Sequence, residues 1–145
     1  MAVPKRLPLK TFEYIYERVP RICVDLVIKS PKGVLLSLRN IPPIGYWHFP
    51  GGSILFNESP ENAVQRVAKE ELGVKVKIVK LLGVISFHNY IGLGHPISIA
   101  YLVKPLSPIK GPVSQASAIK YFKTPPPKTI KQQKDFFKKH LITKK

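Results

Sequence analysis

Residues 51–74 constrain the fold of this chain more than any other segment, because they specify both the start and the end of one helix. Ser59 and the Pro-Glu pair after it supply a capping hydroxyl, a proline for the first helical position and an acid for the first turn. Gly73 suits the left-handed conformation that ends many helices. The pattern therefore predicts a helix that runs through Leu72, preceded by a loop with a glycine pair.

Half of the acids of the chain lie in this segment, within fourteen residues: Glu58, Glu61, Glu70 and Glu71. Arg66 stands four residues before Glu70, so the two side chains share a helix face and can pair. The glycine pair lets a backbone carbonyl approach a ligand with no side chain in the way. A loop carbonyl with two or three carboxylates supplies the hard oxygen ligands that Mg²⁺ or Mn²⁺ prefers. A helix with ordinary solvated carboxylates is the alternative interpretation.

The charge balance predicts an anionic partner. The 145 residues contain 24 Lys and Arg against 8 Asp and Glu, which gives a formal net charge of +16. Residues 104–145 hold eleven lysines and one acid, Asp135. A chain with this charge attracts polyanions: nucleic acid, an anionic membrane or phosphorylated small molecules.

Cysteine usage and the apolar pattern restrict the setting. Cys23 is the single cysteine, which excludes an internal disulfide and a multi-cysteine zinc site and favours a reducing, cytoplasmic location. No stretch approaches the ~18 to 20 apolar residues of a membrane helix, and the first residues lack the apolar run of a secretory signal. We therefore expect no membrane partner.

The remaining pattern predicts one domain over residues 1–145 with a basic, irregular leader at 1–10. Strands are expected at residues 21–29, 34–39, 74–78 with a continuation through 81–87, 97–103 and 118–122, and a short apolar segment at 47–49. Thr11 is expected to cap a helix that runs to about Arg18, and a basic helix is expected at about 129–141. This mixture of strands and helices predicts the α/β (α+β) class.

The segment around the central helix resembles the Nudix box. That pattern has Gly, five residues, Glu, seven residues, Arg-Glu, an aliphatic residue, any residue, Glu-Glu, any residue, Gly and an aliphatic residue. The matching positions in this chain are Gly52, Glu58, Arg66, Ala68, Glu70, Glu71, Gly73 and Val74. Val67 departs from the pattern, because it stands where the family has the first Glu of its Arg-Glu pair. The resemblance identifies the chain as a member of the Nudix hydrolase family.

The resemblance implies a Nudix-type α/β/α sandwich around a mixed β-sheet, and metal-dependent hydrolysis of nucleoside diphosphates linked to another group. It implies Mg²⁺ (or Mn²⁺) bound by the Gly51 carbonyl and by the carboxylates of Glu70 and Glu71. It also implies that Arg66 orients the carboxylates, while Glu58 supports the loop and helix. Because a carboxylate is missing at position 67, fewer metal ions are expected.

Outside the box the chain is similar to the GDP-mannose mannosyl hydrolase branch, which attacks the anomeric carbon of the sugar. The similar features are an acid in the early strand, an arginine at the hairpin end, a Gly-Tyr-Trp approach to the glycine pair and a metal-binding glutamine: Asp25, Arg39, Tyr46, Trp47 and Gln115. Two features of that branch are absent. Ser53 replaces an arginine after the glycine pair, and Ala116 replaces the catalytic histidine.

The sequence leaves the exact roles of the candidate site residues open. Glu71, Arg66, Arg39 and Glu58 are the expected catalytic residues. The expected substrate-binding residues are Asp25, Arg39, Tyr46, Trp47, Ser53 and His88. Asp25 suits a core hydrogen bond and a substrate contact equally well. The favoured substrate is an anionic small molecule with a diphosphate, such as a nucleotide sugar. The alternatives are anomeric-carbon attack, an RNA-cap or nucleic-acid role and a non-catalytic binding module. The sequence leaves a homodimer open.

Overall fold

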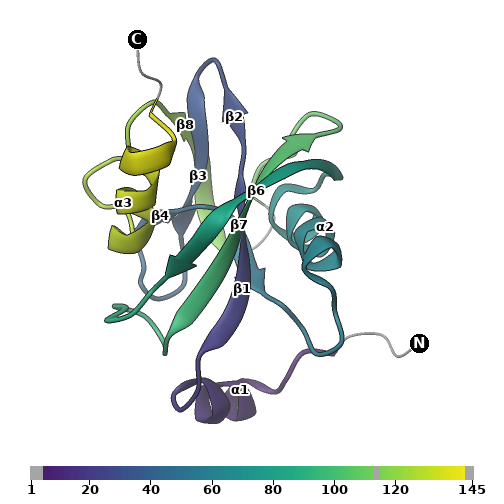
Figure 1. The fold of residues 1–145 in the computed structure, drawn as a ribbon, viewed down its shortest axis with the longest axis vertical. Coiled ribbons are helices and arrows are strands. Elements are labelled where there is room, and N and C mark those ends of the chain that lie inside the picture. The colour runs from purple at the N-terminus through teal and green to yellow at the C-terminus, as the bar shows by residue number, and fades with distance from the viewer. Residues whose placement is uncertain (1–4, 113–114, 143–145) are drawn as a thin grey trace.

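The computed structural model describes residues 5–112 and 115–142, which form three helices and eight strands (Figure 1). The helices are α1 (Leu9–Tyr16), α2 (Pro60–Leu72) and α3 (Lys131–His140). The strands are β1 (Arg21–Val27), β2 (Lys29–Ser30), β3 (Gly33–Arg39), β4 (Trp47–His48), β5 (Gly51–Ser53), β6 (Val76–Ser86), β7 (Pro96–Pro105) and β8 (Ala116–Phe122).

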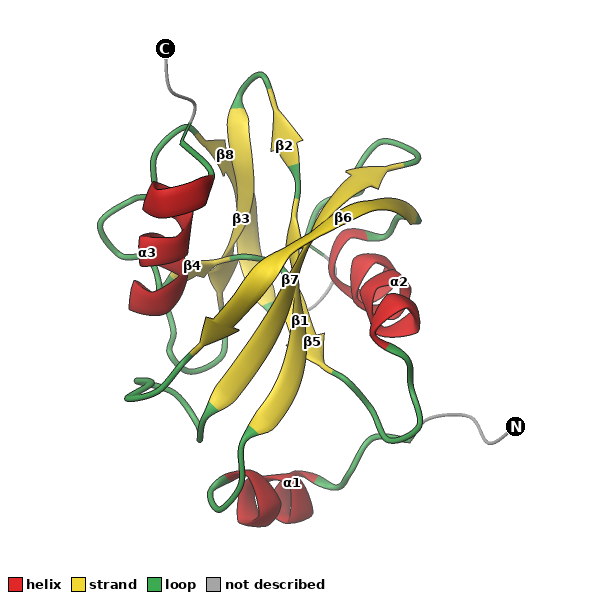
Figure 2. Ribbon diagram, viewed as in Figure 1, coloured by secondary structure: helices red, strands yellow, loops and turns green. Residues whose placement is uncertain are grey.

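The strands form two sheets with helices on both sides. One sheet has the order β5-β1-β7-β6, with β1 and β7 parallel and the other pairs antiparallel. In the other sheet, β3 pairs with β2, β4 and β8. Helices α2 and α3 lie on opposite sides of the strands, and α1 lies at one end of β1 (Figures 1 and 2). This arrangement confirms the predicted α/β/α sandwich around mixed sheets.

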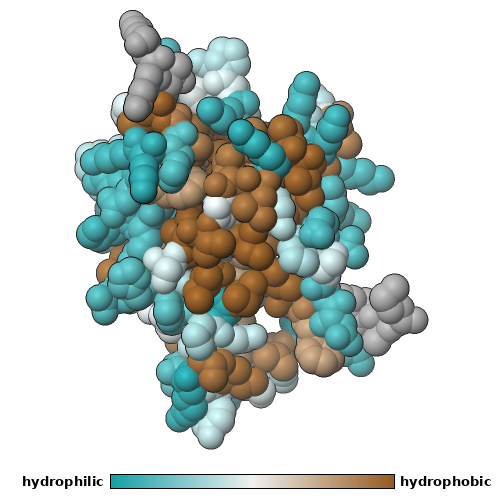
Figure 3. All heavy atoms as spheres, viewed as in Figure 1, coloured by the Kyte–Doolittle hydropathy of each residue, from teal (hydrophilic) through white to brown (hydrophobic). Residues whose placement is uncertain are grey.

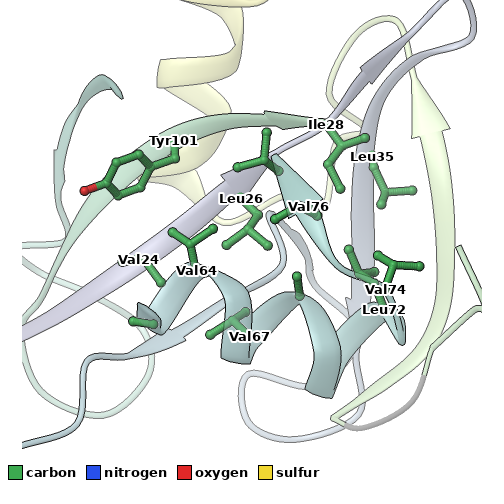
Figure 4. Packing of buried hydrophobic residues seen from close by; sticks show 13 residues of the cluster. Val24, Leu26, Ile28, Leu35, Val64, Val67, Leu72, Val74, Val76 and Tyr101 are labelled. Atoms are coloured by element: carbon green, nitrogen blue, oxygen red, sulfur yellow. The ribbon is translucent and has the colours of Figure 1, made fainter. Parts of the chain in front are cut away.

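Helix α2 has the ends that its sequence predicts. The Ser59 hydroxyl accepts a hydrogen bond from the backbone N–H of Asn62 at 3.1 Å, and Gly73 adopts φ 67° at the C-cap. The apolar face of the helix packs on β1, where Val64 and Val67 are among the buried side chains (Figure 4). Burial of each such side chain stabilises the fold by about 1.5–3 kcal/mol. This packing fixes the opposite, charged face of α2 relative to the glycine loop.

A second core lies beneath α3. The rings of Phe49 and Phe137 stack with centroids 6.4 Å apart, and Ile130 and Leu141 are buried in the same cluster. Gln133 also faces inward and is 2% exposed. Helix α3 therefore carries a polar side chain into the interior between its own core and β1.

Two helix starts differ from the predictions. Helix α1 begins at Leu9 with Pro8 as N-cap, so Thr11 lies inside the helix and does not cap it, and the leader is irregular only before Leu9 in its described part. Helix α3 begins at Lys131, because the Thr129 hydroxyl donates to the Pro126 carbonyl at 2.6 Å in the preceding turn. A proline precedes the start of α1 in place of the expected Thr11 cap, and α3 starts two residues later than expected.

The surface is uneven in polarity. Apolar side chains gather over the β6–β7 side of the first sheet, and hydrophilic side chains cover both flanks (Figure 3). Val84 is 63% exposed and Leu81 is 55% exposed on β6. None of the helices within the described residues is long and apolar enough to cross a membrane.

Candidate active site

Arg66 of α2 joins the helix to the glycine loop. Its Nε and Nη2 atoms donate to the two carboxylate oxygens of Glu58 at 2.7 and 2.9 Å, and its Nη1 donates to Glu70 at 2.8 Å. Nη2 also donates to the Ser53 carbonyl at 2.7 Å. The Arg66–Glu70 pair expected from the spacing is therefore present, and Glu58 is part of the same network.

Glu58 also holds its own loop in place. One of its oxygens accepts a hydrogen bond from the backbone N–H of Leu55 at 3.1 Å, and its side chain is 5% exposed. The hydrogen bonds from Arg66 lower the pKa of Glu58 more than any other interaction, and that pairing raises the pKa of Arg66. Both groups are thus charged near neutral pH, as the supporting role expected of Glu58 requires.

The last turn of α2 carries the remaining carboxylates. Glu70 uses its second oxygen to pair with Arg6 of the N-terminal segment, so guanidinium groups hold both of its oxygens. Glu71 is partly buried, and its charge raises the pKa of Arg39 on β3. The Glu71 charge thus opposes burial, which is the larger cause and lowers the pKa of Arg39.

The glycine pair is tightly enclosed. A Cβ atom at Gly51 would lie 2.5 Å from the Val24 carbonyl oxygen and 2.6 Å from Asp25 Oδ1. A Cβ atom at Gly52 would lie 3.3 Å from a methyl group of Val67. Val67 is 2% exposed, so the position where the family has a glutamate is here part of the core beneath the loop.

Asp25 lies beneath the loop in a buried hydrogen-bond chain. Gln133 of α3 donates to Asp25 Oδ2 at 2.8 Å and accepts from the Phe49 N–H at 3.1 Å. Burial raises the pKa of Asp25 to about 7, although hydrogen bonds from Gln133 and Ser98 oppose the shift. The core hydrogen bond that the sequence left open is present, and the substrate contact stays a prediction.

Two arginines outside the Arg66 network contact Ser53 and Pro42. Arg21 Nη1 donates to the Ser53 hydroxyl at 2.8 Å, and Arg39 Nη2 donates to the Pro42 carbonyl at 2.6 Å. Burial lowers the pKa of Arg39, and the charge of Arg21 lowers it further. The Nε atoms of both residues are buried without a hydrogen-bond partner in the part of the chain that the structure describes.

Tyr90 and His48 interact electrostatically with these arginines. Burial raises the pKa of Tyr90, and the charges of Arg39 and Arg21 oppose part of that shift. The Tyr90 hydroxyl therefore lies within electrostatic reach of both arginines. Burial and the neighbouring Arg39 lower the pKa of His48 to about 3. His48 is therefore neutral near pH 7 and too weak a base to accept a proton readily.

The other predicted residues have packing or surface contacts. Trp47 packs edge-on against Phe122 at 4.8 Å, and the ring of Tyr46 faces the Lys128 ammonium at 5.1 Å. His88 is exposed beside Ser86, and Gln115 is exposed, with its backbone carbonyl 3.3 Å from the Asn40 N–H. The structure thus gathers Glu58, Arg66, Glu70 and Ser53 into one network and gives Trp47 a packing role. Substrate or metal contacts of the exposed residues stay predictions.

Two hollows on the described part of the surface lie outside this group of residues. They measure about 420 and 350 Å³, and the first lies beside Tyr121 and the second beside Tyr16. Within residues 5–112 and 115–142, no three His, Cys, Asp or Glu side chains are grouped so that they could hold a metal ion. Any cation here needs oxygen ligands of other kinds as well.

Arg21, Tyr90 and Arg6 were missed by the sequence reasoning. A cation that opens an otherwise apolar strand was the available signal for Arg21, because Ile-Cys-Val follows it directly. Tyr90 lies in a loop for which only the flanking histidines had been considered. Arg6 gave no signal, since its partner Glu70 lies 64 residues away along the chain.

Known proteins share this architecture. A family model described as NUDIX domain matches residues 19–141. The chain is similar to the low-salt glycan biosynthesis protein Agl8 of Haloferax volcanii, with 46% identity over 86 residues, 59% of this chain and 54% of the relative. It is also similar to an ADP-ribose pyrophosphatase of Methanocaldococcus jannaschii, with 39% identity over 85 residues, 58% of this chain and 50% of the relative. The matches thus span about half the length of these curated relatives.

Solved structures agree with the family match. The MutT NUDIX hydrolase of Burkholderia pseudomallei is 28% identical with a TM-score of 0.68, and the match covers 78% of this chain and 91% of that one. The MutT protein of Methanosarcina mazei Go1 is 22% identical with a TM-score of 0.72, and the match covers 83% of this chain and 91% of that one. This similarity shows a shared fold.

Mixed sheets between helices, with a Glu-Arg-Glu network on the central helix, define a Nudix-type architecture. The chain belongs to the Nudix family.

Proposed function

We propose that this chain hydrolyses the phosphoric anhydride of a nucleoside diphosphate-linked small molecule with the help of a divalent cation. The observation that carries the proposal is the Arg66 network, which fixes Glu58, Glu70 and the Ser53 carbonyl at the junction of loop and helix. A network of this kind holds carboxylates in place before a substrate arrives. A simple surface ion pair does not need a buried partner such as Glu58.

The donor set suits Mg²⁺ or Mn²⁺. Mg²⁺ is usually bound through one or two carboxylates plus substrate phosphates and water, without a dedicated cage of protein ligands. The Gly51 carbonyl, Glu70 and Glu71 are such donors, and Gln115 is a further candidate. A Cβ at position 51 would collide with the Val24 carbonyl and with Asp25, so a glycine is what lets the loop pack this closely on β1. When bound, the cation supplies charge stabilisation at the phosphate oxygens.

The side chains of this protein then have distinct tasks. Arg66 orients Glu70, while Glu58 anchors Arg66 to the loop. Arg39 neutralises negative charge on the substrate, for which its planar group with an unpaired Nε is suited. Glu71 is the proposed group that accepts a proton from the attacking water.

The names of relatives support a diphosphate substrate. The Methanocaldococcus jannaschii relative is an ADP-ribose pyrophosphatase, and the Haloferax volcanii relative is a glycan biosynthesis protein. A nucleotide sugar has both a diphosphate and a sugar, so we propose that substrate class for this chain. A cytoplasmic location is part of the proposal, because Cys23, the single cysteine, is free and buried, which suits a reducing compartment.

The test is product identification in oxygen-18 water. The protein is incubated with Mg²⁺ and a panel of nucleoside diphosphate sugars, dinucleotides, nucleoside triphosphates and capped RNA, and mass spectrometry locates the label. We expect the label in a phosphate, together with a released nucleoside monophosphate. Glu71→Gln should lower the rate by about 100-fold or more. Glu61→Gln, the same charge change at an exposed position on the first turn of α2, is the matched control.

Other outcomes would replace the proposal. Label in the free sugar, with unlabelled nucleoside diphosphate, would indicate attack at the anomeric carbon. Turnover of capped RNA alone would indicate a nucleic-acid substrate. No turnover of any substrate, with Glu71→Gln indistinguishable from the wild type in ligand binding, would indicate a binding module. Gel filtration with light scattering tests the homodimer separately.

A further inference from the structure

Arg21 occupies a position that is built around its guanidinium. The residue opens β1, and its Nη1 atom donates to the Ser53 hydroxyl on the neighbouring strand at 2.8 Å. The rings of Phe12 and Tyr16 on α1 face the same guanidinium, with centroids 5.2 and 5.9 Å away. Because a strand and a helix both hold this group, its orientation is fixed before any ligand binds.

The charge of Arg21 is nevertheless incompletely satisfied. Its Nε atom is buried and has no hydrogen-bond partner among the described residues, and the same holds for Arg39 Nε. The two guanidinium groups are close enough that Arg21 lowers the pKa of Arg39, although burial is the larger cause. Two like charges held together beside unpaired donors are unfavourable in the free protein and become favourable when an anion binds between them.

We propose that Arg21 is a second anion-binding arginine of the site and that, with Arg39, it binds phosphate oxygens of the substrate diphosphate. This inference rests on the proposed function. The planar guanidinium with several N–H donors matches phosphate oxygens in geometry, and two such groups match a dianion in charge. Tyr90, whose hydroxyl lies within electrostatic reach of both arginines, offers a further hydrogen bond to the same anion. Helix α1 acts through Arg21 and determines how well a substrate is held.

The first test measures binding without turnover. Inorganic pyrophosphate is titrated into the metal-free protein in EDTA at fixed ionic strength, and the Kd is measured by calorimetry. We expect Arg21→Gln to weaken binding by about tenfold or more, and Arg21→Lys to recover part of the loss. The control is Arg18→Gln, which removes the same charge from an exposed position three residues away. Equal weakening by Arg18→Gln and Arg21→Gln would overturn the proposal, because bulk positive charge would then explain binding.

The second test separates binding from folding and from chemistry. With a hydrolysed substrate, Arg21→Gln should raise KM by about tenfold while kcat changes less than about threefold. Phe12→Leu should raise KM by a smaller factor, because Arg21 loses one supporting ring. A fall in kcat with unchanged KM, in a variant with wild-type thermal stability, would contradict the assignment. Arg21-dependent pyrophosphate binding without turnover of any substrate would leave this inference standing and overturn the proposed function. Turnover that Arg21→Gln leaves unchanged would do the reverse.

Discussion

The two charged halves of the site differ in how completely they are paired within the chain. On α2, Arg66 makes four hydrogen bonds, and Glu58 and Glu70 each have both oxygens in contact with hydrogen-bond donors. In the other group, Arg21 and Arg39 each have a buried Nε atom with no partner within the described ranges. The group around Arg66, which we call the paired half, forms its hydrogen bonds without a ligand. The group around Arg21 and Arg39, the unpaired half, keeps N–H donors that have no acceptor among the described residues.

This difference indicates separate roles for the two halves. A network with satisfied hydrogen bonds contributes to stability and fixes geometry, so its loss should appear as unfolding. Donors held without partners cost stability in the free protein, so their loss should appear in ligand affinity. Enzymes commonly combine a rigid supporting network with groups that become satisfied only when substrate binds.

The largest expected effect follows from breaking the paired half. Arg66→Gln leaves the buried Glu58 carboxylate without its charged partner, so we expect the free energy of unfolding to fall by about 3 kcal/mol. Urea unfolding monitored by circular dichroism measures this change in the free energy of unfolding. Hydrolysis should fall by about 100-fold or more as well, because Glu70 loses its orientation.

A matched variant on the other half sharpens this comparison. Arg21→Gln removes a guanidinium whose Nε has no partner, but it also removes the hydrogen bond to Ser53 and the contacts with the two rings of α1, so we expect the free energy of unfolding to fall by about 1 kcal/mol. If Arg21→Gln destabilised the protein as much as Arg66→Gln, the two halves would contribute equally to stability, and the proposed division of roles would be wrong.

The glycine pair should give the next effect in size. Gly51→Ala places a methyl group against the Val24 carbonyl and the Asp25 carboxyl, which must shift, so we expect a loss of about 2 kcal/mol. Gly52→Ala meets a single methyl group of Val67 at 3.3 Å and should cost less than about 1 kcal/mol. Thermal unfolding of the two adjacent variants tests the order. Equal losses would mean that the close approach at Gly51 is unimportant.

A smaller effect should appear in the pH dependence of stability. The pKa of His48 falls from 6.5 to about 3 in the folded chain, so between these values the unfolded state binds a proton that the native state does not. Stability from this group is present above about pH 6.5 and is lost as the pH falls toward 3. Its loss amounts to about 1 kcal/mol at pH 5.5.

His48→Gln should remove that part of the pH dependence, measured by urea unfolding between pH 5 and 8. Arg39→Gln should raise the pKa of His48 without restoring 6.5, because burial remains the larger cause, and NMR titration measures that shift. Parallel stability curves for the wild type and His48→Gln would refute the assignment.

The smallest effect is expected at Arg6. Its side chain is 60% exposed, so the pair with Glu70 contributes little to stability. Because Arg6 competes with a cation for one Glu70 oxygen, Arg6→Gln should tighten Mn²⁺ binding by about twofold, measured by electron paramagnetic resonance. The control is Lys5→Gln, which makes the same charge change at the residue next to Arg6. An equal gain from both variants would assign the effect to net charge.

The paired half was predictable because its signals are local. The cap at Ser59, the terminator Gly73 and the four-residue spacing of Arg66 and Glu70 lie within one helix and its ends, and the structure has all three. The alternating and apolar runs likewise predicted the long strands. Helix starts were less predictable: α1 begins after Pro8 and not at a Thr11 cap, and the Thr129 hydroxyl bonds to the preceding turn, so that α3 begins at Lys131.

The unpaired half was only partly predictable because it comes from distant segments. Arg39 was a candidate from its place at the hairpin end, but its neighbours Arg21 and Tyr90 come from the start of β1 and from the loop before β7. The pairing of β1 with β7 places Arg21 beside the loop that holds Tyr90, while Arg39 comes from β3 in the other sheet. No pattern within a single segment carries that information. The buried position of Val67 also needed the structure, since its spacing alone marked only a missing carboxylate.

Helix α1 has a consequence for how such a protein can evolve. It spans Leu9–Tyr16 and ends before residue 19, where the match to the family model begins. Its two rings nevertheless face Arg21, which lies inside the matched region. With Arg21 in its proposed binding role, substitutions in this helix alter ligand affinity while the central helix and its glycine loop stay unchanged. The N-terminal helix is thus an accessory element that can diversify separately from the region shared with the family.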